Sequence, residues 1–157
     1  ARTPVAVVCA GAKSILDLPL TLEVLETQGV PVVAVGQEGF PAFYSRESGL
    51  KADFRIDEPA ALAAFLRCHW GLGLSSGVVV ANPVPATHEI PAAQVEVWIA
   101  QALREADEQG IHGKASTPFM LKRLAELSQG RSLATNIELV KHNAVLGARL
   151  ATELAKA

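Results

Sequence analysis

The feature that most constrains the fold of this chain is an apolar, β-branched run that stops at a glycine and a lysine. Val5 to Cys9 is followed directly by Ala10-Gly11-Ala12-Lys13. Consecutive apolar residues bounded by a glycine turn are typical of a buried strand of a parallel sheet. Because glycine permits a sharp turn, we expect Lys13 at the carboxyl edge of the sheet, where open α/β folds bind ligands.

Three interpretations of Lys13 stay open on the residues alone. It is a solvated loop lysine, or it belongs to a phosphate cradle with Gly11 and Ser14 ahead of a helix N-terminus. The glycine spacing of a P-loop is absent from this stretch. The third interpretation is a nucleophilic amine. A buried lysine beside helix-end amides loses solvation, which favours the neutral form and permits a Schiff base with a sugar aldehyde.

Apolar patterns along the rest of the chain predict an α/β fold, with a mostly parallel sheet flanked by helices on both faces (α/β/α). After the strand ending at Cys9, we expect strands at 31–35 and 78–81 and a short one within 53–57. Proline and glycine positions predict helices at 19–28, from Pro59 to about 70, at 92–109 and at 117–128, with Thr117 as the N-cap of the last.

A final helix is expected from Ser132 almost to the end of the chain. Its apolar positions recur at steps of three and four, so we predict that they form its core face. They are Leu133, Ile137, Val140, Ala144, Ala148 and Ala151. Asn136 and Asn143 are seven apart and share a face bordering that stripe. These asparagines either bond to neighbouring loops or belong to a site, because polar groups near a core need partners.

Three other features have two interpretations each. Asn82, at the end of a predicted strand, is a turn former or a site residue. Arg46 is solvated or holds an anion. The aromatic rings of Phe40, Phe43 and Tyr44 plug one end of the core or cover a ligand.

Composition argues against several classes of protein. The chain has 157 residues, of which 50% are hydrophobic and 19% charged, so it is long enough for one domain with a real core. Its net charge of −2 and few aromatic residues argue against a nucleic-acid partner. No apolar run has the length of a membrane span. We expect Cys9 and Cys68 to be buried free thiols in a reducing compartment, the cytoplasm. The four histidines lack the spacing of metal ligands, so we expect no metal held by this chain alone.

Five motifs, in order along nearly the whole chain, resemble those of the pseudouridine-5'-phosphate glycosidases, the family also called indigoidine synthase A-like. They are Ala10-Gly11-Ala12-Lys13-Ser14-Ile15-Leu16-Asp17-Leu18, Phe40-Pro41-Ala42-Phe43-Tyr44, Val80-Ala81-Asn82-Pro83-Val84-Pro85, Gly113-Lys114-Ala115-Ser116-Thr117-Pro118-Phe119 and Ser132-Leu133-Ala134-Thr135-Asn136-Ile137. The sequence departs from the family pattern at Met120, where leucine is usual, and at His142, where asparagine is common.

The resemblance implies a lyase that reversibly cleaves the carbon–carbon glycosidic bond of pseudouridine 5'-phosphate into ribose 5-phosphate and uracil. It implies that Lys13 is the catalytic lysine, which captures C1' of the sugar as an imine, and that Asn136 binds the substrate. It also implies a divalent metal cofactor, usually manganese, and assembly as a homotrimer.

Family members are roughly twice as long, and the resemblance covers only their C-terminal half. The general acid, a second lysine and the metal ligands belong to the other half. The chain also begins without methionine and enters a predicted core strand at once. We therefore expect residues 1–157 to be the C-terminal half of one catalytic domain, inactive and structurally incomplete without an upstream half. Two other classes stay open: a different Schiff-base lyase acting on a sugar phosphate, and a non-enzymatic sugar-phosphate-binding module.

Overall fold

The structure of the chain, a computed structural model, describes residues 1–13 and 16–156. Four strands form one sheet with the order β1-β4-β2-β3, and every neighbouring pair is parallel. The strands are β1 (Ala6–Cys9), β2 (Val32–Ala34), β3 (Phe54–Arg55) and β4 (Val78–Ala81). Five α-helices join them within the described ranges: α1 (Leu18–Thr27), α2 (Pro59–Gly71), α3 (Ala92–Glu108), α4 (Ser116–Leu127) and α5 (Arg131–Ala155).

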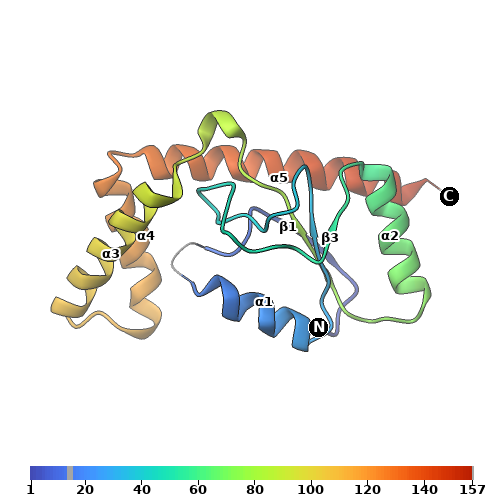
Figure 1. Ribbon diagram of the computed structural model, residues 1–157, viewed down its shortest axis with the longest axis horizontal. Helices are drawn as coiled ribbons and strands as arrows, with labels where there is room; N and C mark the ends of the chain where they lie inside the picture. The colour runs from blue at the N-terminus through green and yellow to red at the C-terminus, as the bar shows by residue number, and fades with distance from the viewer. Residues whose placement is uncertain (14–15, 157) are drawn as a thin grey trace.

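Helices cover both faces of the sheet, which confirms the predicted α/β/α fold (Figure 1). On one face, α1 packs through Leu18, Leu22 and Leu25. On the other face, α2 and α5 meet over the strands through Leu66 and Leu150. The longest helix, α5, runs across the whole width of the molecule in Figure 1.

The central strand of the sheet is β4, between β1 and β2. Its Val78 and Val80 side chains are fully buried, as is Val33 of β2. Val79 pairs in register with Val7 on one side and Val32 on the other. The valine-rich run favours this place because β-branched side chains pack well when a parallel strand is covered on both faces.

β1 is an edge strand and is only half buried, so the expectation of a fully buried strand at its position is wrong. Val5 and Val7 are 46% and 49% exposed. The physical reason is that α1 lies over β2 and β4 and leaves this side of β1 uncovered.

The core face of α5 also differs from the prediction. Its buried apolar residues are Leu139, Leu146 and Leu150, while Leu133, Ile137 and Val140 are 56%, 47% and 57% exposed. The helix has two apolar faces, and the sequence pattern picked the one that is bare in this structure. Periodicity identifies an apolar face but does not say which neighbour covers it.

Two smaller predictions are also wrong. Helix α4 begins at Ser116, so Thr117 lies inside its first turn and is not the N-cap. Cys68 is exposed on α2, because the buried residues of that helix are Leu62, Ala63, Leu66 and His69.

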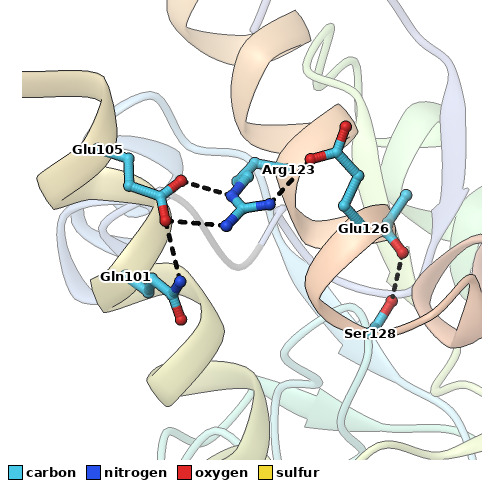
Figure 2. A network of polar contacts seen from close by, with 6 residues as sticks. Gln101, Glu105, Arg123, Glu126 and Ser128 are labelled. Carbon is cyan, nitrogen blue, oxygen red and sulfur yellow. Dashed lines mark hydrogen bonds and ion pairs between the residues drawn. The ribbon is translucent and has the colours of Figure 1, made fainter. Parts of the chain in front are cut away.

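Helices α3 and α4 form a hairpin that extends beyond the sheet (Figure 1). Arg123 of α4 binds Glu105 of α3 and Glu126 one turn further along its own helix. Gln101 Nε2 donates to Glu105 Oε1 at 2.9 Å, which completes the network in Figure 2. This polar network ties α4 to α3.

Candidate active site

The parallel strands bring the ends of β1, β4 and β2 to one edge of the sheet, and the candidate lysine follows the first of these. Gly11 makes the turn with φ +88°, and a Cβ there would lie 1.9 Å from the carbonyl oxygen of Pro41. The Phe43 amide donates to the Ala10 carbonyl at 2.9 Å. The loop that delivers Lys13 is therefore held against the segment of residues 40–43, and only glycine fits at its turn.

Lys13 itself is exposed, so the structure does not show the burial that the nucleophile interpretation invoked. Helix α1 begins only at Leu18, and the Asp17 carboxylate caps it by accepting from the Leu20 amide at 2.9 Å. Capping by an acidic side chain offsets the positive end of the helix that was expected near the lysine. Ser14, the other residue of the suggested phosphate cradle, lies outside the described residues, as does Ile15 of the same motif.

The thiol of Cys9, at the end of β1, is the other potential nucleophile at this edge. Burial raises the pKa of this thiol, outweighing a lowering hydrogen bond from the Gly11 backbone. A raised pKa keeps the thiol protonated at neutral pH and unreactive. Lys13 is therefore the better candidate for a nucleophile at this edge of the sheet.

Asn82 ties the central strand to α5. It is 3% exposed, and its Nδ2 donates to Asn143 Oδ1 at 3.0 Å. His142 Nδ1 lies 3.1 Å from both Asn82 Nδ2 and the Pro83 carbonyl oxygen, so its tautomer decides whether it accepts or donates. The sequence singled out Asn82 and Asn143 separately but did not predict that they bond to each other.

Asn136 is half-buried on α5, seven residues before Asn143, whose Oδ1 accepts from Asn82 at the end of β4. Leu139, one turn later, packs against Ala10 and Val84. Thr135 Oγ1 donates to the His88 carbonyl at 2.8 Å, which anchors this turn of the helix. The fold thus brings Asn136 and the Lys13 loop to the same edge of the sheet.

Other candidates from the sequence have structural roles. Arg46 Nη1 donates to the Val84 carbonyl at 2.8 Å, and its backbone amide donates to Glu89 Oε1 at 2.8 Å. Phe40 and Tyr44 are 1% and 4% exposed and belong to the core.

The residues that the structure describes do not fit a manganese site. Within residues 1–13 and 16–156, no three His, Cys, Asp or Glu side chains are grouped so that they could hold a metal ion. In the same ranges, no helix is both long enough and apolar enough to span a membrane.

Comparisons with known proteins agree with the resemblance in the motifs. Residues 1–153 match the family described as indigoidine synthase A like protein. The pseudouridine-5'-phosphate glycosidase of Cupriavidus pinatubonensis is 60% identical over 157 residues, which are 100% of this chain and 50% of that protein. The enzyme of that name from Solibacter usitatus is 58% identical over 154 residues, which are 98% of this chain and 52% of that protein. The chain spans about half the length of the curated relatives it matches.

Solved structures give the same picture of fold and length. The prealnumycin C-glycosynthase AlnA in complex with ribulose 5-phosphate matches with a TM-score of 0.87 and 34% identity, over 99% of this chain and 53% of that one. An indigoidine synthase A-like protein from Thermotoga maritima matches with a TM-score of 0.86 and 35% identity, over 95% of this chain and 49% of that one.

Proposed function

The chain belongs to the indigoidine synthase A-like family, and from that premise we propose that it is the lysine-bearing part of a pseudouridine-5'-phosphate glycosidase. The reaction is the reversible cleavage of pseudouridine 5'-phosphate into ribose 5-phosphate and uracil. The observation that carries the proposal is 60% identity, over the whole chain, to a relative of that name. The position of Lys13 at the carboxyl edge of the sheet supports it.

The proposed chemistry uses Lys13 as a covalent catalyst. In the direction of synthesis, the aldehyde carbon of ribose 5-phosphate condenses with Lys13 Nζ, and water leaves as the imine forms. The imine carbon then accepts the electron pair of C5 of uracil, C5 loses its proton, and the sugar's 4'-hydroxyl oxygen displaces Lys13 Nζ from C1' as the ribose ring closes. In the direction of cleavage, Lys13 Nζ displaces O4' from C1' and opens the ring, the C1'–C5 electron pair returns to uracil, C5 takes a proton, and water hydrolyses the resulting imine. A carbon leaving group needs such an electron sink, which ordinary glycoside hydrolysis does not provide.

The rest of the site is proposed to come from the half of the relatives that this chain does not span. We expect that half to lie upstream and to contribute the general acid and the ligands of a divalent metal, manganese. Asn136 is proposed to bind the substrate from α5. Assembly as a homotrimer and a cytoplasmic location complete the proposal, and the two free thiols, Cys9 and Cys68, are consistent with a reducing compartment.

Borohydride trapping tests the covalent step. The complete protein, made by joining this chain to the other half of the Cupriavidus pinatubonensis relative, is incubated with ribose 5-phosphate and sodium borohydride. We expect reduction of the imine to a stable secondary amine, found by peptide mass spectrometry on Lys13. Lys51→Ala, which removes an exposed lysine elsewhere, serves as the control and should still be labelled at Lys13. Labelling elsewhere, or none, would remove Lys13 from the chemistry.

A second candidate function has one observation in its favour. The solved structure of AlnA belongs to a C-glycosynthase bound to a sugar phosphate, and it shares 34% identity with this chain. That relationship favours carbon–carbon bond formation between a sugar phosphate and an acceptor other than uracil. Release of uracil from pseudouridine 5'-phosphate by the complete protein distinguishes the two, because only the glycosidase performs it at a useful rate.

A further inference from the structure

Phe43 differs from the other two aromatic residues of its motif in both burial and backbone. Phe40 and Tyr44 are buried, whereas Phe43 is half-buried. Its backbone φ is +64°, in the left-handed region that a bulky side chain rarely adopts. Among the non-glycine residues that the structure describes, only Gln129 also has a positive φ, and it lies just after a helix end, where that conformation is common. The conformation of Phe43 therefore needs another explanation.

The positive φ belongs to a tight turn of residues 42–45. The Ala42 amide donates to the Ser45 carbonyl at 2.9 Å, and the Ser45 amide donates back to the Ala42 carbonyl at 3.5 Å. Glycine is favoured in such a hairpin turn where φ is positive, because it has no Cβ to clash with the backbone. Phenylalanine at this position costs folding free energy that glycine would not, and strain of this kind is concentrated at functional sites.

Phe43 lies between the two residues proposed to act on the substrate. Its amide donates to the carbonyl of Ala10, three residues before Lys13, at 2.9 Å. Its side chain packs against the cluster that contains Ala10 and Leu139, and Leu139 follows Asn136 by three residues on α5. The turn thus brings the ring to the carboxyl edge of the sheet, beside the Lys13 loop and the Asn136 turn of α5.

A buried neighbour fixes the orientation of the Phe43 ring. The Tyr44 ring meets it edge to face, with a centroid distance of 4.8 Å and an angle of 86° between the two planes. Phe43 also packs against the cluster that contains Ile90 and Val95. A ring that is held in place and still partly exposed can stack on a planar heterocycle at little cost in side-chain entropy.

We propose that Phe43 determines specificity for the base, and that its ring packs on the pyrimidine ring of the substrate. The inference rests on the proposed function, which supplies a planar base. Once the carbon–carbon bond is broken, Lys13 holds the sugar covalently, but uracil stays in the site only through non-covalent contacts. A contact made to the base throughout the reaction lowers KM for uracil and leaves kcat nearly unchanged.

Steady-state kinetics in the direction of synthesis test the contact on the complete protein described above. With saturating ribose 5-phosphate, Phe43→Leu should raise KM for uracil about 10-fold, because it removes the aromatic face and keeps an apolar side chain. KM for ribose 5-phosphate and borohydride labelling of Lys13 should stay within about 2-fold of the unmodified protein. Phe43→Tyr keeps the ring and should keep KM for uracil within about 3-fold.

Phe65→Leu is the matched control. Phe65 is another half-buried phenylalanine that pairs with an aromatic ring, since its centroid lies 5.4 Å from that of Phe54. It belongs to α2, away from the Lys13 loop, and its substitution should leave both KM values within about 2-fold. Dihydrouracil serves as a second probe because its ring is puckered and stacks poorly. Its inhibition constant should change less than about 3-fold in Phe43→Leu.

Three results would overturn the proposal. An unchanged KM for uracil in Phe43→Leu would show that the ring does not touch the base. Equal increases in both KM values, or weaker labelling of Lys13, would show that the ring only supports the Lys13 loop. An equal loss of affinity for uracil and dihydrouracil would exclude stacking. If Phe43→Leu does not fold, Phe43→Met takes its place, because methionine is also apolar and adapts to irregular space.

Equilibrium dialysis of uracil against the complete protein gives a readout that does not need turnover. We expect Phe43→Leu to bind uracil about 10-fold more weakly than the unmodified protein. If that loss is seen and the unmodified protein forms no product, the proposed function fails while this inference stands. If product forms and Phe43→Leu keeps a normal affinity for uracil, this inference fails while the proposed function stands.

Discussion

The two edge strands of the sheet, β3 and β1, differ in length, charge and exposure. The β3 edge is two residues long and carries a bidentate ion pair, with Arg55 Nη2 2.7 Å from Asp57 Oδ2. Asp57 also accepts from the Gly36 amide at 2.8 Å, so this edge is short, charged and bonded to its own loop. The β1 edge is four residues long, and Val5 and Val7 there are about half exposed.

Natural sheets blunt their outer edges with short strands and charges, because open strands invite pairing with other chains. By that criterion the β3 edge is blunted and the β1 edge is not. The candidate catalytic lysine lies on the open side, because Lys13 follows β1. We therefore expect substitutions on the β1 side to affect activity and assembly, and substitutions on the β3 side to affect the folding of the chain alone.

The largest expected effect is that of Lys13→Ala on the complete protein. Removing a covalent catalyst should lower kcat about 10³-fold or more, with the thermal midpoint unchanged because the side chain is exposed in this chain. Lys51→Ala, near the β3 edge, is the matched control and should keep normal turnover. Steady-state kinetics measures this. If Lys13→Ala only raised KM, as loss of a phosphate contact would, Lys13 would not be a covalent catalyst.

The next effect compares a covered with an uncovered apolar residue. Leu66→Ala should lower the free energy of unfolding of the 157-residue chain by about 2–5 kcal/mol, because it leaves a cavity between α2 and the sheet. Val140→Ala should change that free energy by less than about 0.5 kcal/mol, since the side chain is already in water. Urea denaturation measures both. A large effect at Val140 would mean that other residues of the isolated chain cover this side chain.

Substitutions of Asn136 and Asn82 should affect activity and stability differently. Asn136→Ala should lower the activity of the complete protein while costing no more than about 1–2 kcal/mol of stability. Asn82→Ala should cost about 1–3 kcal/mol, because it removes a buried amide and leaves the half-buried Asn143 carbonyl group without its donor. Thermal melts and kinetics on the same preparations check this. Normal activity with a large loss of stability in Asn136→Ala would make that residue purely structural.

The sequence predicted the positions of the strands and helices better than it predicted the contacts between them. Each strand was predicted within a few residues, because valine runs and glycine turns are local signals. The face of α5 was not, since Leu139 and Ile137 are equally apolar and only tertiary packing decides which is covered. The exposure of Lys13 was left open for the same reason: burial at an edge depends on what lies beyond it. Asn82 and Asn143 were each singled out, but they lie 61 residues apart and no local signal predicts their hydrogen bond.

The smallest expected effect concerns the Arg123 network, which joins α3 to α4 and lies away from both edges of the sheet. The hydrogen bond from Arg123, followed by that from Gln101, lowers the pKa of Glu105 below its ordinary value of 4.5. A carboxyl whose pKa is lower when folded stabilises the fold above its unfolded pKa, and that contribution disappears as the pH falls through the folded pKa. Glu105→Gln should therefore melt slightly below the unmodified chain at pH 7, and the difference should vanish once the pH drops well below 4.5. It should also shrink in 1 M salt, since the ion pair is partly exposed. Val140→Ala, which removes no titrating group, should show a difference from the unmodified chain that does not change with pH. A Glu105→Gln difference that did not change with pH would mean that it does not arise from the ionised carboxylate.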